Sequence, residues 1–303
     1  MKPRHFLTLM DLSPDELTGL LQRAIELKAI VQRGEHYEPL HGKMLAMIFD
    51  KSSTRTRVSF QTGMAQLGGS SIFLAPRDTH LGRGEPIEDT ARVLSRMVNA
   101  VVIRTHAQAT LEAFAKHAGV PVINALTDMY HPCQLLADLQ TYTERRGSIR
   151  GKTVAWIGDG NNVCHSWIDA AHLMHFELRI ATPPGYEPDS TLRKRSHRHL
   201  TLTHDPVEAV RNADVVVTDT WASMGQENEK ARREHDFAGF LVNQELMAQA
   251  NAGALFMHCL PAYRGCEVTP EVIDGPQSVV WDEAENRLHS QKALLELLFE
   301  VKP

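Results

Sequence analysis

Short apolar runs alternate with helical patterns along this chain of 303 residues, and that alternation limits the possible folds more than any other feature. In the first half, the apolar runs are 44–49, 72–75, 100–103 and 120–125, and the helical patterns lie near 58–67, 86–97, 111–117 and 135–143. Short apolar strands separated by helices indicate a parallel sheet with helical cover. The sequence therefore predicts an α/β fold.

A polar segment at residues 144–148 separates this series from a second one. The strands expected in the second series are 154–157, 178–181, 215–218, 255–258 and 279–281. A chain of this length can form two domains that each bury a core. We predict two doubly wound domains, 1–147 and 148–303, each with a central parallel sheet flanked by helices. The final helix, within 284–303, is amphipathic enough to pack on either domain.

Composition and charge narrow the classes of partner. The chain has 32 basic and 37 acidic residues, a formal net charge of -5, which argues against a nucleic-acid or acidic-membrane partner. No apolar run approaches the roughly 20 residues that span a bilayer, and the first residues do not open a signal peptide. We therefore expect a cytoplasmic protein. Its four cysteines form no Cys-x-x-Cys pair and are expected to be free thiols.

An anion site is expected where the run 44–49 ends, because Ser53, Thr54, Arg55, Thr56 and Arg57 follow it and lead into a helical pattern. A helix N-terminus has unpaired backbone N–H groups and roughly half a positive charge, and the hydroxyl and guanidinium groups add further donors. Without a Gly-x-x-x-x-Gly-Lys pattern this is no nucleotide P-loop. The segment indicates a site for a tetrahedral oxyanion, and the alternative is a Ser-capped helix with solvated arginines.

Two other strand ends in the first domain carry polar groups. Arg104 follows 100–103, and His131 and Gln134 follow 120–125. In open parallel sheets, ligands bind beyond the carboxyl ends of the strands, so we expect these groups at the same site. Taken singly, Arg104 is typical of a surface charge and His131 of a capping or core histidine. Together, cations and an amide suit a phosphate joined to a polarisable carbonyl.

The second domain offers groups that suit an amino acid. Asp219 follows 215–218 and could receive an ammonium group, while Ser223 could bind a carboxylate. Asn162 lies in a segment that begins like a dinucleotide fingerprint, but Val163 replaces the third glycine, so a dehydrogenase is not expected. The alternatives are an Asn held in a turn and an Asp/Ser pair that caps a helix.

A thiol is expected at the end of 255–258, where Cys259 follows His258. A Cys-His nucleophile pair stays open, although neighbours in a strand point to opposite faces. For the same reason, and because no second ligand pair has a suitable spacing, no metal is expected. Arg287 opens the final helix, and it lies either over the ligand site or on the helix surface.

Four motifs, in this order, resemble the ornithine carbamoyltransferases of the aspartate/ornithine carbamoyltransferase family. They are Ser53-Thr54-Arg55-Thr56-Arg57, His131-Pro132-Cys133-Gln134, Asp219 with Ser223-Met224-Gly225, and His258-Cys259-Leu260-Pro261. The resemblance runs from the first helix to the last. It implies direct attack of the δ-amine of L-ornithine on carbamoyl phosphate through a tetrahedral intermediate, giving L-citrulline and phosphate in arginine metabolism. It also implies a homotrimer without metal or cofactor.

The resemblance assigns carbamoyl phosphate to the first domain and L-ornithine to the second. The residues implied for carbamoyl phosphate are Ser53, Thr54, Arg55, Thr56, Arg104, His131, Gln134, Cys259, Leu260 through its backbone, Arg287, and His80 from a neighbouring subunit. Those implied for ornithine are Asn162, Asp219, Ser223 and Met224. Arg104, His131 and Cys259 are the implied catalytic residues.

Other functions stay open from sequence alone. Aspartate carbamoyltransferases resemble the chain in Ser-Thr-Arg-Thr-Arg and His-Pro-x-Gln, but an anionic Asp219 suits an amine-bearing substrate better than a dicarboxylate. Putrescine or N-acylated ornithine as the acceptor, or a non-catalytic protein that binds a phosphate ligand, are further alternatives. The sequence does not separate a biosynthetic from a degradative direction, and it does not show assembly beyond a trimer.

Overall fold

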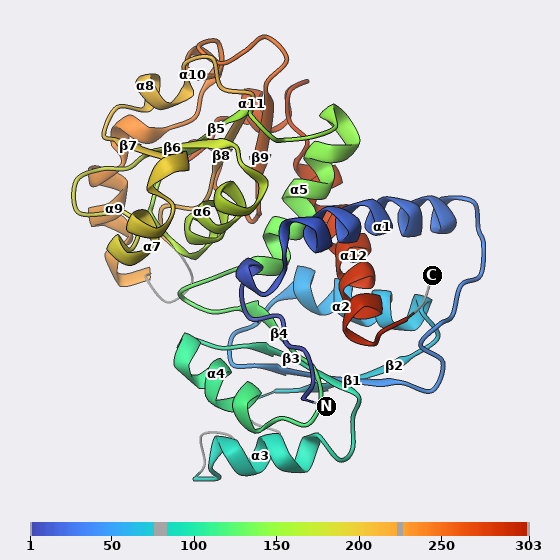
Figure 1. Ribbon diagram of the computed structural model, residues 1–303. Helices are drawn as coiled ribbons and strands as arrows, with labels where there is room; N and C mark the ends of the chain where they lie inside the picture. The colour runs from blue at the N-terminus through green and yellow to red at the C-terminus, as the bar shows by residue number, and fades with distance from the viewer. Residues whose placement is uncertain (1, 76–83, 223–226, 302–303) are drawn as a thin grey trace. The chain divides into compact units, whose positions relative to one another are not determined.

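The computed structural model describes residues 2–75, 84–222 and 227–301, which form two compact units (Figure 1). Unit 1 comprises Met1–Gln140 with Glu285–Pro303, and unit 2 comprises Thr141–Ala284. The chain passes between the units within helices α5 (Pro132–Arg146) and α12 (Val280–Leu298). Each unit contains a parallel sheet flanked by helices, so the predicted α/β fold class is confirmed.

The sheet of unit 1 has the order β2-β1-β3-β4, and each neighbouring pair is parallel. Its strands are β1 (Met44–Phe49), β2 (Ser70–Leu74), β3 (Ala100–Arg104) and β4 (Val122–Leu126). Its remaining helices are α1 (Pro14–Gln32), α2 (Thr54–Gln66), α3 (Ile87–Leu94) and α4 (Gln108–His117). Helices α3 and α4 cover one face, and α1, α2 and α12 lie over the other (Figure 1). Strands β1 and β3 are buried on both faces, which explains their continuous apolar sequences.

Helix α1 begins where its sequence provides a complete cap. The Ser13 hydroxyl accepts a hydrogen bond from the Glu16 backbone N–H, and the Glu16 carboxylate accepts one from the Ser13 backbone N–H. Along the helix, Leu17, Leu20 and Leu21 are buried. Arg23 binds Glu296 at 2.7 Å and so joins α1 to α12 within unit 1.

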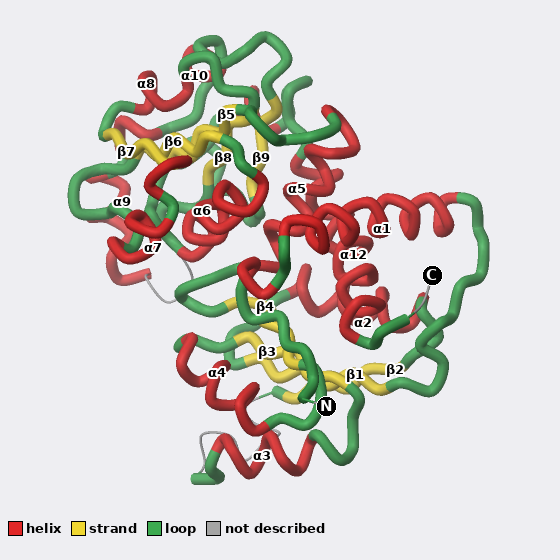
Figure 2. Tube along the Cα trace, viewed as in Figure 1, coloured by secondary structure: helices red, strands yellow, loops and turns green. Residues whose placement is uncertain are grey.

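The sheet of unit 2 has the order β7-β6-β5-β8-β9 and is also parallel. Its strands are β5 (Thr153–Ile157), β6 (Glu177–Ala181), β7 (Leu200–Thr203), β8 (Val215–Thr218) and β9 (Leu255–His258). Its further helices include α6 (Asn162–Met174), α7 (Ser190–Arg195), α8 (Pro206–Val210), α9 (Lys230–Asp236), α10 (Gln244–Met247) and α11 (Pro270–Ile273). Within this unit, helices lie on both faces of the strand layer (Figure 2).

The strand order reverses once in each sheet. In unit 1 the reversal falls between β1 and β3, and in unit 2 between β5 and β8. Loops leave the two strands in opposite directions at such a point and open a crevice beyond their carboxyl ends, which is where ligands bind in open α/β sheets. The residues that follow β1, β3, β5 and β8 are therefore the first to consider as a functional site.

One expected strand of the second series is wrong, and one strand of the structure was not expected. Residues 279–281 are not a strand, because α12 begins at Val280 and only Ser278 forms an isolated bridge, with Phe256. Three apolar residues are too few to distinguish a strand from the first turn of a helix. Strand β7 was not expected, because its alternating Leu and Thr residues form a partly exposed edge strand without a continuous apolar run.

No helix in the described parts of the chain is long and apolar enough to cross a membrane. The four cysteines, all within those parts, are free thiols.

The loop between β5 and α6 depends on a glycine. A Cβ atom at Gly160 would lie 2.3 Å from the backbone nitrogen of Pro188, far inside van der Waals contact. Gly19, in the middle of α1, has nothing within 4 Å of the same position. We predict that Gly160→Ala lowers the melting temperature, because backbone atoms must move. Gly19→Ala should raise it slightly, because the higher helix propensity of Ala increases the free energy of unfolding by about 1 kcal/mol. Calorimetry of both variants checks this, and equal melting temperatures would contradict it.

Candidate active site

Helix α2 presents its N-terminus directly after β1. The Ser53 backbone is extended, and its hydroxyl accepts a hydrogen bond from the Thr56 N–H at 3.3 Å, so Ser53 is the N-cap. No acidic residue lies in the first turn. The positive end of the helix dipole therefore faces the end of β1 without an internal carboxylate to offset it.

The two arginines of this segment have different surroundings. Arg55 is near enough to His131 for its positive charge to lower the pKa of the imidazole. Arg57 instead places its guanidinium 3.9 Å from the centroid of the Phe73 ring and donates to Gln61 at 3.2 Å. Within unit 1, Arg55 thus belongs with the strand-end groups, and Arg57 packs beside β2.

Unit 1 contains two further arginines among these groups, and both are buried. Arg104 ends β3 and is 5% exposed, and Arg287 of α12 is 2% exposed. Arg287 donates to Gln134 Oε1 at 2.7 Å and to Thr56 Oγ1 at 3.0 Å, so it links α5 with the first turn of α2. The amide of Gln134 donates in turn to Asp138 Oδ1 at 2.8 Å, a partner that sequence analysis did not identify.

His131, immediately before α5, is buried beside this positive charge. Burial, together with the charges of Arg287, Arg104 and Arg55, lowers the pKa of His131 well below 6.5. Its imidazole is therefore neutral at pH 7 and can serve as a hydrogen-bond partner without adding charge. Unit 1 thus brings together the predicted group of Arg55, Arg104, His131, Gln134 and Arg287 at one edge of its sheet.

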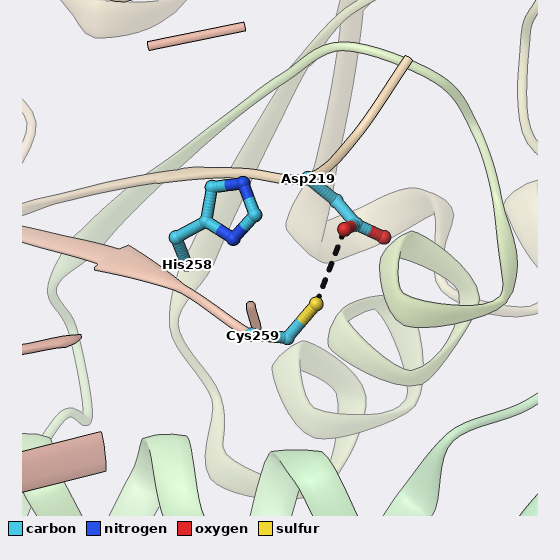
Figure 3. A group of neighbouring side chains, drawn as sticks. All are labelled: Asp219, His258 and Cys259. Atoms are coloured by element: carbon cyan, nitrogen blue, oxygen red, sulfur yellow. Dashed lines mark hydrogen bonds between the residues drawn. The ribbon is translucent and has the colours of Figure 1, made fainter. Parts of the chain in front are cut away.

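In unit 2 a carboxylate and a thiol meet at the ends of β8 and β9. The Cys259 thiol donates to Asp219 Oδ1 at 3.1 Å (Figure 3). The same oxygen accepts the Thr220 backbone N–H at 2.7 Å, and Asp219 is 8% exposed. Because its partners are donors, this carboxylate is held as an acceptor, the form that suits an ammonium group.

His258 is not paired with the thiol as a general base. Its Nδ1 accepts the Leu260 backbone N–H at 2.9 Å, so Nε2 carries the proton and donates to Glu267 at 3.1 Å. The ligand atoms of Asp219, His258 and Cys259 lie within 4.8 Å of one another, a group that could hold a metal ion. Both nitrogens of His258 are occupied, however, so a metal would first have to break one of these hydrogen bonds. The residues present do not favour a resident metal.

The other thiol of the predicted motifs is inert. Cys133 donates to the Asn124 carbonyl at 3.3 Å, and burial raises the pKa of its thiol to about 12. A thiolate is the reactive form, so Cys133 is unsuited to act as a nucleophile.

Asn162 is the first residue of α6, as its place after β5 suggested. Its neighbour Asn161 was not singled out from the sequence, yet its amide donates to Asp219 Oδ2 at 2.8 Å. The sequence did contain a signal for it, because Asn is among the preferred N-cap residues and Asn161 directly precedes α6.

Some predicted site residues fall outside these groups. His80, Ser223 and Met224 lie outside the described residues. Cys259 and Leu260, implied for carbamoyl phosphate, belong to unit 2, and Leu260 has a positive φ of 57°. Ser53 and Thr54 lie with Thr56 at the start of α2 in unit 1.

Two doubly wound parallel sheets, one with cationic groups and one with a carboxylate at the carboxyl ends of the strands, define a two-unit α/β protein. The chain belongs to the aspartate/ornithine carbamoyltransferase family. Residues 4–144 match the family's carbamoyl-phosphate-binding domain, and residues 150–298 match its aspartate/ornithine-binding domain.

Relatives match the chain over nearly its whole length. It is 65% identical to the ornithine carbamoyltransferase of Methylococcus capsulatus, over 98% of this chain and 99% of the relative. It is 59% identical to the anabolic ornithine carbamoyltransferase of Pseudomonas aeruginosa, over 99% and 98%. The solved ornithine carbamoyltransferase of Pyrococcus furiosus is 49% identical and superposes with a TM-score of 0.95, over 100% of this chain and 99% of that one.

The buried neutral histidine predicts a pH effect on stability. The folded protein keeps His131 neutral because its pKa is lowered, while an unfolded chain takes up a proton below about pH 6.5. This stability is present above that pH and is lost as the pH falls through it. We expect the melting temperature of the wild type to fall more between about pH 7 and pH 5.5 than that of His131→Gln. His36→Gln, at an exposed position, is the control, and parallel profiles for all three proteins would contradict the prediction.

Proposed function

We propose that this protein is an enzyme that transfers the carbamoyl group of carbamoyl phosphate to the δ-amine of L-ornithine, giving L-citrulline and phosphate in arginine biosynthesis. The observation that carries this proposal is the identity of 65% and 59% with ornithine carbamoyltransferases across 98% and 99% of the chain. One of these relatives is named anabolic, which supports the biosynthetic direction.

In unit 1, the proposed ligand is carbamoyl phosphate. The first turn of α2, with Ser53, Thr54, Arg55 and Thr56, would hold the phosphate. Arg104 would bridge the phosphate and the carbonyl oxygen, and His131, Gln134 and Arg287 would bind the carbamoyl end. Donors fixed around an oxygen that gains charge stabilise the transition state more than the ground state. A neutral His131 supports this assignment, since it can hydrogen-bond the carbamoyl group.

In unit 2, the proposed ligand is L-ornithine, with contacts from Asn162, Asp219, Ser223 and Met224. The attacking δ-amine must lose a proton, and an amine with an unshifted pKa of about 10.4 would be neutral in only about one molecule in two thousand at pH 7. That fraction corresponds to a penalty of about 4.6 kcal/mol. Asp219, which already accepts a hydrogen bond from the Cys259 thiol, would accept the proton of the amine, and Cys259 would help to orient the amine.

The proposed mechanism is direct attack, with a tetrahedral intermediate and no enzyme-bound intermediate. The Cys259 thiol donates to a carboxylate, while the imidazole of His258 is engaged by Leu260 and Glu267. In a Cys-His nucleophile pair the imidazole takes the proton of the thiol, and the imidazole of His258 does not contact Cys259 in this way. Cys259 and the Leu260 backbone are assigned to the carbamoyl group, and neither a metal nor a cofactor is part of the proposal.

The assembly proposed is a homotrimer in the cytoplasm, as expected from the resemblance and from the composition. His80 would reach the site of a neighbouring subunit in such a trimer. Light scattering of the purified protein tests the trimer.

The substrate is tested with a panel of amines. Citrulline formation from carbamoyl phosphate and L-ornithine is compared with product formation from aspartate, putrescine and N-acetylornithine at matched concentrations, without added metal. We predict strong preference for L-ornithine, because the contacts proposed for Asp219 and Ser223 suit an ammonium and a carboxylate group, and ornithine alone in this panel combines both with a free δ-amine. Preference for another amine would overturn the ornithine assignment, and no product with any amine would support a non-catalytic phosphate-ligand-binding protein.

The phosphate assignment is tested with two arginines of the same helix. Arg55→Ala should raise the KM for carbamoyl phosphate by roughly 10- to 100-fold, the loss expected for a hydrogen bond to a charged group. Arg57→Ala should change it less than about threefold, because Arg57 packs on Phe73 and binds Gln61. Steady-state kinetics of the two variants make the comparison. A normal KM in Arg55→Ala, or an equal rise in both variants, would refute the assignment.

A further inference from the structure

Asn161 has two different hydrogen-bonding tasks in unit 2. Its Oδ1 accepts the backbone N–H groups of Val163 at 2.9 Å and Cys164 at 3.1 Å, which caps α6. Its Nδ2 donates to Asp219 Oδ2 at 2.8 Å. Reversing the amide would place its NH₂ group against two N–H donors and its oxygen against a carboxylate, so these partners fix one orientation.

The bond from Asn161 completes the donors around Asp219. Oδ1 accepts from the Thr220 N–H and from the Cys259 thiol, and Oδ2 accepts from Asn161. The χ2 torsion of Asp has a broad, roughly two-fold potential, so a carboxylate keeps one orientation only when its neighbours fix both oxygens. Asn161 therefore helps to fix the plane of the Asp219 carboxylate, so that one of its two equivalent oxygens is directed at Cys259.

We propose that Asn161 is a positioning residue that holds the Asp219 carboxylate toward Cys259 and so prepares it for the amine substrate. The inference rests on the proposed function for its substrate and adds a residue to that site. Asn161 acts through Asp219, and its amide ties the carboxylate to the N-terminus of α6. The capping task alone does not require an amide, because Asn, Asp and Ser cap helices about equally well. Only the bond to Asp219 requires a side chain as long as that of Asn with an N–H donor at its end.

Asn161→Ser separates the two tasks. Serine retains an oxygen that caps α6 but is too short to reach Asp219. We expect a similar melting temperature, a rise of about tenfold or more in the KM for ornithine, and a KM for carbamoyl phosphate within about twofold of the wild type. Asn243→Ser is the matched control, since Asn243 caps α10 through Leu246 and has no bond to Asp219. Equal KM values for ornithine in Asn161→Ser and the wild type would overturn the proposal.

Asn161→Asp retains the cap and places a second carboxylate where the amide donated to Asp219. Two adjacent carboxylates share a proton at lower pH and repel each other once both are ionised. The ratio of kcat/KM for ornithine in the variant to that in the wild type should therefore fall as the pH rises from about 6 to 9. A purely structural role for Asn161 would give a ratio independent of pH.

The reactivity of Cys259 tests the positioning without any turnover. In Asn161→Asp, the added negative charge beside Asp219 should shift the midpoint of Cys259 alkylation by iodoacetamide upward by about half a pH unit or more, followed by peptide mass spectrometry. An unchanged midpoint would overturn the proposal. If the wild type forms no citrulline, the proposed function fails, and this thiol measurement still tests whether position 161 contacts the Asp219–Cys259 pair in the folded protein.

Discussion

Buried positive charge at the carboxyl edge of the unit 1 sheet is the constraint on which the rest of that site depends. Arg104 and Arg287 are almost completely buried, and Arg287 donates to the neutral groups Gln134 and Thr56. Burying a cation is costly unless negative charge compensates it. The same charge keeps His131 neutral. An anionic ligand at the N-terminus of α2 would add negative charge beside these buried guanidinium groups.

Unit 2 has the same architecture, but its strand ends carry a buried carboxylate in place of buried cations. There a carboxylate, Asp219, lies where β8 ends, and backbone, amide and thiol donors hold it in one orientation. In both units the functional groups follow strands on either side of the point where the strand order reverses. The groups of unit 1 suit an anion and the carboxylate of unit 2 suits an ammonium group, which is the pairing that the proposed carbamoyl transfer to an amino acid requires.

The sequence predicted the α/β class because buried parallel strands appear as continuous apolar runs, and 44–49, 215–218 and 255–258 coincide with β1, β8 and β9. Strand β7 was missed because an edge strand lacks such a run. Polar residues after the strands identified Arg104, His131 and Asp219 as candidates. Asp138 lies four residues after Gln134 on the same helix, a local spacing that the sequence contained and that was not used for the prediction. Asn161 follows a strand, but its bond to Asp219, 58 positions away, depends on side-chain geometry that no local pattern encodes.

The most direct test of the central claim is a calorimetric titration of the protein with carbamoyl phosphate in the absence of ornithine, repeated at increasing ionic strength. A site formed by buried guanidinium groups and the N-terminus of α2 should bind one molecule per chain, with an affinity that weakens as salt competes for the anion. Absence of binding without ornithine, or an affinity independent of salt, would contradict the claim that this charge cluster is the phosphate site.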